Sequence, residues 1–149
     1  GHAVTLADSQ RRQAACHPVR LLVDCESHTR MPQPLITPYS MLPTDVRDSL
    51  RAKEVLDFGL NVQADSFAFD DTHCTLPTSL VVGYALAVAT SGDARRVLLA
   101  GFDGYGADDP RSQEMQQLLE QYQAAEGALP MTAITPTRYG LHSESVYAL

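Results

Sequence analysis

The residues best placed to do chemistry lie in the stretch 98–115, which reads LLAGFDGYGADDPRSQEM. An apolar run stops at Gly101, and an acidic, aromatic, glycine-rich turn precedes a predicted helix. Gly101 and Gly104 permit a turn with positive φ or a close approach of the backbone to a ligand. Asp103 could accept hydrogen bonds from ribose or sugar hydroxyls, and Tyr105 offers a stacking face for a base or sugar. The alternative is a tight turn in which Asp103 caps backbone N–H groups.

The glycines of this turn do not follow G-x-G-x-x-G, so the sequence carries no dinucleotide fingerprint. Asp108 and Asp109 place negative charge at the start of the following helix, where a phosphate would otherwise bind. We therefore expect the sugar or base end of a ligand at Asp103 and its phosphate elsewhere. Arg138 is the best partner for a phosphate or carboxylate, because its planar fork binds such groups bidentately.

Ligands of open α/β sheets bind beyond the carboxyl ends of the strands, and this rule selects a larger set of residues. The set comprises Asp24, Cys25, Glu26, Thr37, Tyr39, Ser40, Asp70, Asp71, His73, Gly101, Asp103, Gly104, Tyr105, Thr135, Thr137, Arg138 and Tyr139. The predicted ligand-binding residues within it are Gly101, Asp103, Gly104, Tyr105, Thr137, Arg138 and Tyr139.

Candidates for catalysis are Asp70, His73 and His142, although the catalytic residues stay unknown. Asp70 and its neighbour Asp71 could bind a divalent ion beside His73, or act with it as base and orienting group. The alternative is that these are unligated strand ends. His142 belongs to the closing segment, which either forms one wall of the cleft with Arg138, Tyr139 and Ser143 or docks over the sheet through Leu141 and Val146.

Cysteine and histidine spacing does not predict a metal site. Cys16-His17 and Cys25-x-x-His28 resemble zinc ligands loosely, but a structural zinc normally needs two well-spaced pairs. We expect buried thiols, no bound metal and no cofactor. The three cysteines cannot all pair with one another, which favours a reducing, cytoplasmic compartment.

Six short apolar runs predict strands. They cover residues 3–7, 19–25, 34–38, 66–70, 96–103 and 131–135. Several of these runs are continuous rather than alternating, which is typical of strands that are covered on both faces in a parallel sheet.

Three segments predict helices between the later strands. The first spans residues 44–58, with Thr44 as its cap and Gly59 at its end. The second runs from near Pro77 to before Gly92 and is apolar almost all round, so it should be buried. In the third, Asp109 is the N-cap and Pro110 the first helical residue.

The faces of the later helices can also be predicted. In the second helix, Gly83 and Ala87 would let the backbone approach a neighbouring element closely. In the third helix, one apolar face is expected from the spacing of Met115, Leu118, Leu119 and Tyr122.

Alternating strands and helices with short connections predict an α/β fold. With right-handed crossovers this becomes an open, doubly wound, mostly parallel Rossmann-like sheet in three layers, α/β/α. We expect residues 1–149 to form a single domain. Because the chain begins Gly-His rather than Met, it is expected to be a fragment of a longer protein.

Charge and hydropathy exclude several classes of partner. The chain has 11 Lys and Arg against 18 Asp and Glu, a net charge of −7, which argues against nucleic acid and anionic membranes. The longest apolar stretch, residues 80–89, is too short to span a bilayer, and no signal peptide is visible. A small anionic ligand is still allowed, because a few arginines can hold one locally. The oligomeric state cannot be predicted.

A resemblance covers most of the chain. Its strongest part is LAGFDGY followed by DDPR and EM, within residues 59–122, and residues 134–149 and 3–13 also match. These residues resemble the C-terminal domain that follows an aldolase-type barrel in bacterial proteins of surface-polysaccharide clusters, which are 4-hydroxy-2-oxovalerate aldolase-like or HMG-CoA-lyase-like. The domain is distantly similar to MptE-like pyrophosphokinases and bacterial sialyltransferases, whose first strand and Gly-rich loop are not in this sequence.

The resemblance implies a domain that binds a nucleotide- or phosphate-bearing sugar-type ligand in cell-surface polysaccharide biosynthesis. If the domain is an enzyme, the resemblance implies a transferase, with any lyase activity belonging to an upstream barrel. The alternative is a non-catalytic accessory or assembly domain of an aldolase-like protein. In that case the strand ends would be plain turns, and exposed apolar surface would match the barrel.

Overall fold

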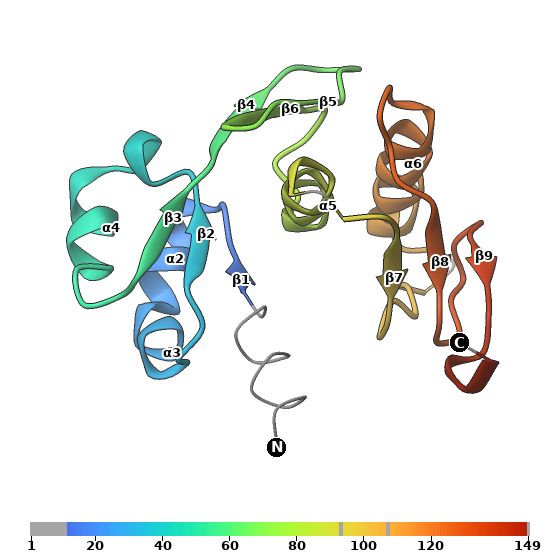
Figure 1. Ribbon diagram of the computed structural model, residues 1–149, viewed down its shortest axis with the longest axis horizontal. Coiled ribbons are helices and arrows are strands. Elements are labelled where there is room, and N and C mark those ends of the chain that lie inside the picture. The colour runs from blue at the N-terminus through green and yellow to red at the C-terminus, as the bar shows by residue number, and fades with distance from the viewer. Residues whose placement is uncertain (1–11, 93, 107, 149) are drawn as a thin grey trace.

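The computed structural model describes residues 12–92, 94–106 and 108–148. Helices and small, mostly parallel sheets make up an α/β architecture, and the described strands form no closed barrel (Figure 1). The helices are α2 (Pro18–Val23), α3 (Cys25–Arg30), α4 (Thr44–Ser49), α5 (Val81–Ser91) and α6 (Pro110–Ala124), with the 3-10 helices η1 (Tyr39–Met41) and η2 (Val146–Ala148). The strands are β1 (Gln13–Ala14), β2 (Leu35–Thr37), β3 (Val55–Asp57), β4 (Gly59–Val62), β5 (Ala68–Phe69), β6 (His73–Leu76), β7 (Val97–Leu99), β8 (Met131–Ala133) and β9 (His142–Ser143).

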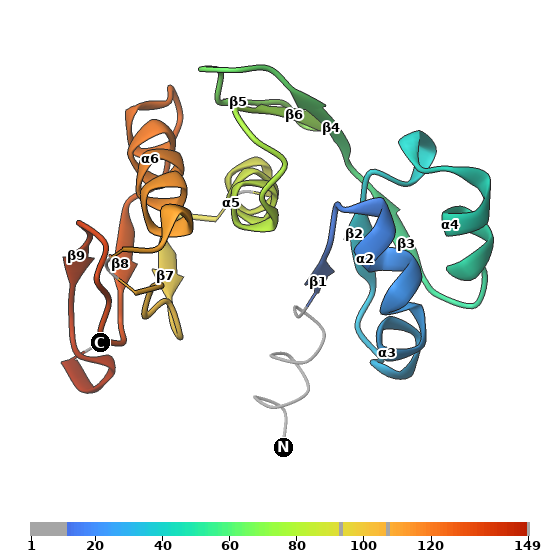
Figure 2. The same ribbon diagram turned by 180° about the vertical axis from the view of Figure 1, so that it is seen from behind.

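The first sheet is parallel and has the order β1-β2-β3, with Leu35 opposite both Gln13 and Val55. Figures 1 and 2 show this sheet between α2 and α4 on one side and α5 on the other. The side that faces α2 and α4 is filled by a core of Leu21, Leu35, Leu42, Val46 and Leu50. Both faces of the sheet are therefore covered, as parallel strands require.

One extended segment joins the first sheet to the second. Phe58 follows β3 and donates its N–H to Thr37 O in β2 at 3.1 Å. The next N–H, that of Gly59 in β4, donates to Thr72 O at 2.9 Å, just before β6. Successive N–H groups of a strand point to opposite edges, so β2 and β6 lie on opposite sides of this segment. The second sheet then has the order β4-β6-β5, parallel between β4 and β6 and antiparallel between β5 and β6.

Helix α5 is shared by the two other hydrophobic cores. On one side Tyr84 and Ala87 pack with Cys16, Ile36, Phe58, Cys74 and Leu76 of the first two sheets. On the other side Leu86 packs with Met115, Leu118, Leu119 and Tyr122 of α6, and with Met131 and Tyr139. A Cβ added at Gly83 would lie 3.2 Å from a methyl carbon of Leu118, which confirms the predicted close approach of this helix to its neighbour.

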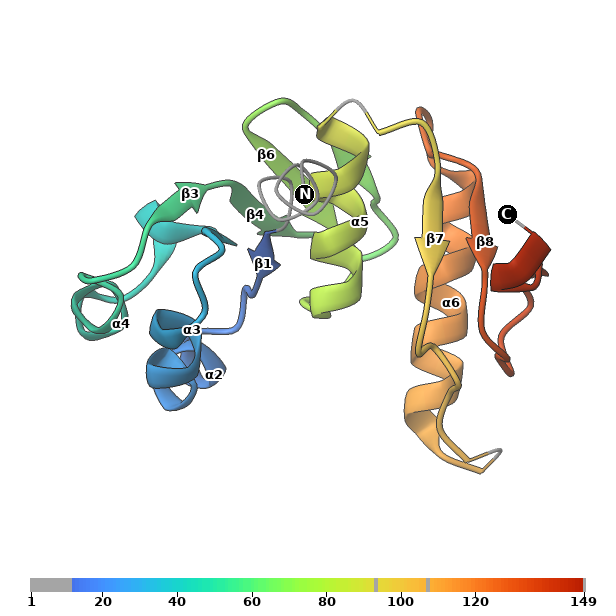
Figure 3. The same ribbon diagram turned by 60° about the horizontal axis from the view of Figure 1, so that its bottom comes forward.

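The third sheet is parallel and has the order β7-β8-β9. Helix α6 runs alongside β7 and β8 (Figure 3), and its predicted apolar face is buried. Asp109 caps this helix as expected, because its side chain accepts a hydrogen bond from the backbone N–H of Arg111 at 2.9 Å. Pro110 occupies the first helical position.

The structure corrects the strand predicted over residues 19–25. This segment forms α2, followed by Asp24 as a cap, so Asp24, Cys25 and Glu26 do not end a strand. Pro18 begins the helix, and an Arg20–Asp24 ion pair of 2.8 Å has the i,i+4 spacing of a helix. Only Leu21 of this helix is buried. The periodicity of a short apolar run does not distinguish a strand from a helix, and here Pro18 favours the start of a helix.

The helix predicted over residues 44–58 is also wrong in its second half. Helix α4 ends at Ser49, and residues 55–57 form β3 instead. Leu50 is buried beneath the first sheet, and the pairing of Val55 with Leu35 draws the following residues into that sheet. Tertiary pairing thus outweighs the local helical pattern. The pattern also failed to predict β6, whose first residue is the candidate His73.

The other predicted elements have strands or helices at the expected places. The strands expected at 34–38, 66–70, 96–103 and 131–135 correspond to β2, β5, β7 and β8, and the second and third helices to α5 and α6. The strand predicted over residues 3–7 lies outside the described residues. Within the described residues, the nine strands fall into three sheets of three, rather than one open sheet.

The position of α5 can be tested with Leu86→Ala. Leu86 is 3 % exposed in the core between α5 and α6, so the truncation should lower the free energy of unfolding by about 2–5 kcal/mol. The matched control is Val81→Ala at the start of the same helix, where the side chain is 47 % exposed. The control should cost less than about 1 kcal/mol. Equal costs in urea unfolding would contradict the shared core.

Candidate functional site

The candidate site forms where the turn after β7 contacts the turn after β8. Gly101 N–H donates to Thr135 Oγ1 at 2.9 Å, and Asp103 O accepts from Arg138 N–H at 3.0 Å. Because β7 and β8 are parallel neighbours, their carboxyl ends lie at the same edge of the sheet. Two of the turns that the rule of strand ends selected therefore lie side by side.

Two glycines of the first turn have the positive φ that the sequence predicts, +71° at Gly101 and +104° at Gly104. Gly104 is needed for a second reason. A Cβ built there would lie 3.3 Å from Cβ of Arg138 and 3.5 Å from Cζ of Tyr139. A side chain at this position would be strained in the backbone and would push the two turns apart.

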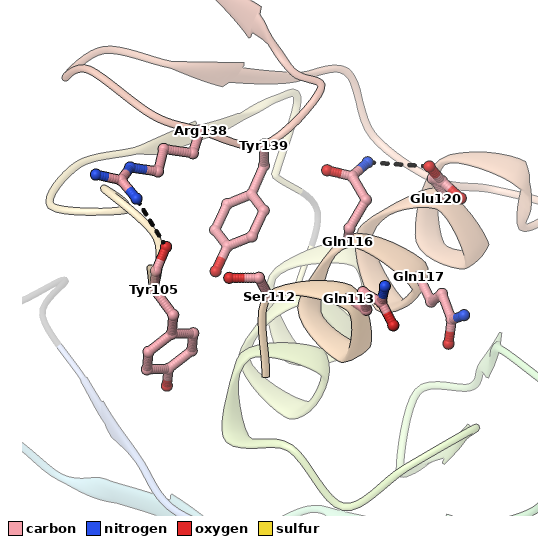
Figure 4. A pocket seen from close by; sticks show the side chains of 8 residues that line it. All are labelled: Tyr105, Ser112, Gln113, Gln116, Gln117, Glu120, Arg138 and Tyr139. Carbon is pink, nitrogen blue, oxygen red and sulfur yellow. Dashed lines mark hydrogen bonds between the residues drawn. The ribbon is translucent and has the colours of Figure 1, made fainter. Parts of the chain in front are cut away.

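Two pockets adjoin at these turns and share Tyr105 and Tyr139. The larger, of about 590 Å³, is drawn in Figure 4 and is lined by Tyr105, Ser112, Gln113, Gln116, Gln117, Glu120, Arg138 and Tyr139. The smaller, of about 370 Å³, is lined by Val82, Gly101, Phe102, Asp103, Gly104, Tyr105, Met115 and Tyr139. Volumes of this size are typical of small-molecule sites.

Two arginines hold Tyr105 from different sides. Arg111 lies over the Tyr105 ring, with its guanidinium carbon 4.1 Å from the ring centre, which is a cation–π contact. Arg138 Nη1 donates to the carbonyl oxygen of Tyr105 at 3.3 Å. The turn is thereby held before any ligand binds.

The positive charge of Arg138 is available to an anionic ligand, whereas that of Arg111 is not. Asp109 accepts hydrogen bonds from the Arg111 side chain, which lower the pKa of Asp109 and raise that of Arg111. The positive charge of Arg111 is therefore balanced. Within the described residues, Arg138 makes no ion pair with a carboxylate. Arg138 is thus the cation at this site that remains available to an anion.

Of the seven predicted ligand-binding residues, six line the two pockets or form the turn at which they meet. The seventh, Thr137, lies in the second turn, where its hydroxyl accepts from Tyr139 N–H at 3.2 Å. The alternative in which Asp103 caps the turn finds no support, because its carboxylate makes no hydrogen bond within the described residues. The backbone oxygen of Asp103 is bonded, and the capping carboxylate is that of Asp109. That these residues bind a ligand stays a prediction.

Sequence reasoning missed the contribution of α6 to the larger pocket. Ser112, Gln113, Gln116, Gln117 and Glu120 recur at spacings of three and four, beside the apolar face of this helix. The spacing could have indicated a polar stripe. It could not show that the turn at Arg138 lies across from that stripe.

The candidate catalytic residues lie apart from the pockets. His73 Nδ1 is 3.9 Å from Asp70 Oδ1 at the exposed turn between β5 and β6, in the second sheet. His142 lies exposed in β9, with Nε2 3.0 Å from Glu144 Oε1. Neither histidine lines the two pockets, so the pairing of His142 and Ser143 with Arg138 and Tyr139 as one wall does not hold. Leu141 packs into the α6 core as the docking alternative expects, and the Val146 side chain lies outside the described ones.

The other polar strand ends selected by the rule are placed elsewhere. Thr37 ends β2 fully buried, and Tyr39 and Ser40 begin η1. Among the described residues, no group of three or more His, Cys, Asp or Glu side chains could hold a metal ion. Cys16 and Cys74 are buried, Cys25 is partly exposed, and all three are free thiols. The expected absence of metal and cofactor stays a prediction.

No family model matches this chain, and no curated protein or solved structure is significantly similar to it. Among the described helices, none has the length and apolar character needed to cross a membrane.

The buried thiols predict a loss of stability at alkaline pH. Burial raises the pKa of Cys16 to about 11 and, together with the nearby Cys16, that of Cys74 to about 12. Both thiols stay protonated in the folded chain above pH 9, the ordinary pKa of a thiol, while the unfolded chain loses these protons. The free energy of unfolding should therefore be maintained below about pH 9 and fall as the pH rises toward 11 and 12.

Urea unfolding across this pH range provides the measurement. Cys74→Ala should make the free energy of unfolding fall less steeply at alkaline pH, whatever stability the variant loses at neutral pH. Cys25→Ala, at a partly exposed thiol, should leave the slope unchanged. The same slope in all three proteins would show that the thiols do not cause the fall.

Proposed function

We propose that this chain binds a nucleotide- or phosphate-bearing sugar-type ligand at the two adjoining pockets. We propose that this function belongs to bacterial cell-surface polysaccharide biosynthesis, as the resemblance implies. If the domain catalyses a reaction, we propose transfer of a group from an activated or phosphorylated substrate. Any lyase activity would belong to an aldolase-like barrel in the same longer protein.

The meeting of the turns after β7 and β8 is the observation that carries this proposal. It brings Asp103 and Arg138 to neighbouring pockets, where the carboxylate is without a hydrogen bond in the described part of the chain. An exposed carboxylate at a strand end can accept from sugar hydroxyls, and Arg138 can hold an anionic group. Tyr105 provides a ring against which a sugar or base could pack.

We further propose that the fold is Rossmann-like. Support comes from the parallel pairs β7–β8 and β2–β3, each connected through a helix. Placement of the candidate site at the carboxyl ends of β7 and β8 also agrees with where such folds bind ligands.

A thermal-shift titration tests the proposal. The chain is heated with CMP, with CTP, with nucleotide sugars and with sugar phosphates, each over a range of concentrations. A ligand that binds only the folded state raises the melting temperature in proportion to its saturation. No shift with any compound, in a protein that also carries the expected barrel, would favour the accessory role instead.

Asp103→Asn should weaken ligand binding by about 1–3 kcal/mol, which is typical for the loss of a hydrogen bond to a charged group. Because the carboxylate is exposed, the melting temperature without ligand should hardly change. Calorimetric titration measures the affinity. The control is Asp71→Asn, the same change at an exposed position of another turn. If Asp103→Asn instead unfolds the chain and leaves the affinity of folded molecules unchanged, Asp103 has a structural role.

One observation favours the alternative, an accessory domain that packs against an aldolase-like barrel. Val19, Leu22 and Val23 are 63, 41 and 66 % exposed, and their spacing places them on one face of α2. Exposed apolar side chains that gather on one face are typical of contact with a partner.

Limited proteolysis of the longer protein tests this alternative. Val23→Lys should make the domain easier to release, because a charge would be buried at the contact with the barrel. Val62→Lys is the matched control, since Val62 is 52 % exposed on β4. Equal release of both variants and the parent would contradict a contact through α2.

A further inference from the structure

We infer that the larger pocket takes the hydroxyl-bearing part of a ligand with a single anionic group, with that group at Arg138 and the hydroxyls along α6. This inference rests on the proposed function, because it concerns the same pair of pockets. It goes further in naming the chemical class of the bound part and in assigning a role to α6.

Charge limits the ligand to one anionic group. The side chains that line the two pockets include one cation, Arg138, and two carboxylates, Asp103 and Glu120. Arg111 is nearby, but its charge is balanced by Asp109 at 2.6 Å. A guanidinium fork pairs with one carboxylate or one phosphate group. A diphosphate would bring further negative charge beside two carboxylates that have no second cation to offset it.

The side chains of α6 suit hydroxyl groups. Gln113 and Gln117 are exposed, and each amide offers both donors and an acceptor, as a hydroxyl does. Gln116 is already engaged, because its oxygen accepts from Gly140 N–H at 2.9 Å and its nitrogen donates to Glu120 Oε1 at 3.0 Å. Gln116 thereby orients Glu120 and ties α6 to the turn of Arg138.

The cation Arg138 and the amide side chains of α6 lie at opposite ends of the larger pocket. Figure 4 shows Arg138 and Tyr105 at one end and Gln117 and Glu120 at the other, with Tyr139 and Ser112 between them. A ligand that spans the pocket would therefore place its anionic group and its hydroxyls apart.

Aromatic surface for a base is limited. Arg111 covers one face of the Tyr105 ring, and Tyr139 is 8 % exposed with its ring packed against Phe102 at 5.7 Å. A base is best held between two planar faces. A partly exposed Tyr105 ring and a row of amides suit a sugar better.

NMR titration of the chain tests the inference with four probes. Gluconate carries a carboxylate, glucose 6-phosphate carries a phosphate monoester, sorbitol is the uncharged control, and CDP carries a diphosphate. We expect gluconate or glucose 6-phosphate to bind at least tenfold more tightly than sorbitol and CDP, with shifted resonances in α6. The tighter of the two charged probes identifies the anionic group.

Matched variants test which end of the larger pocket binds the anionic group and which binds the hydroxyls. Arg138→Gln should weaken the charged probe at least tenfold, and Arg138→Lys, which keeps the charge without the fork, should weaken it less. Arg96→Gln makes the same charge change at an exposed residue beside the other end of β7 and should have no effect. Gln117→Ala should weaken the charged probe about threefold or more, whereas Gln123→Ala, on the same helix but outside the pocket, should not.

The outcomes separate this inference from the proposed function. Tighter binding of CDP or CMP that depends on Asp103 but not on Arg138 or Gln117 would overturn the inference and leave the proposed function standing. Equal affinity of gluconate and glucose 6-phosphate for the parent, Arg138→Gln and Arg138→Lys proteins would also overturn it. If neither these probes nor the nucleotide sugars bind, this inference and the proposed function are both wrong.

Discussion

Burial of α5 on two sides is the constraint on which the rest of the structure depends. Tyr84 fills the core beneath the first two sheets, and its hydroxyl donates to the carbonyl oxygen of Phe58 at 2.6 Å, where β3 passes into β4. Leu86 fills the core against α6. The absence of a side chain at Gly83 lets Leu118 of α6 come into contact. The third sheet shares no strand pairing with the first two, so it is held against them by side-chain packing, through α5 and through the contacts of Phe67 and Phe69 with Tyr122 of α6.

The candidate site follows from the way the third sheet is held. Helix α6 packs along β7 and β8, and this places its start beside the turn after β7. The capping carboxylate of Asp109 then does two things, since it satisfies the helix N-terminus and balances the charge of Arg111. Arg111, paired with Asp109, lies over the Tyr105 ring, whereas Arg138 makes no ion pair with a carboxylate among the described residues. Because the helix-capping residue Asp109 balances the charge of Arg111, Arg138 is the arginine at this site whose charge is available to an anionic ligand.

The candidate site was predictable in part. Gly101, Asp103 and Gly104 are recognisable because glycines and an acidic residue end an apolar run, and such turns need positive φ. Arg138 was selected through the rule that parallel strands end at one edge and because its planar fork suits an anionic group. Gln113 and Gln117 could not be selected, because exposed glutamines are ordinary on a helix surface and only packing shows what faces them. Asp70, His73 and His142 are compatible with catalysis by residue type alone, and the tertiary structure separates them from the pockets.

By itself, the sequence determined the elements whose local chemistry is strong: α5 through its continuous apolar run, α6 through Asp109, Pro110 and its apolar face, and the short strands β2, β7 and β8. Only the tertiary structure decided the rest. Residues 55–57 became a strand because they pair with β2, although their local pattern also allows a helix. Residues 19–23 became part of a helix that begins at Pro18, although their apolar run also allows a strand. Strand partners, and hence the division into three sheets, depend on contacts between distant residues. No local pattern specifies which edge a strand will meet.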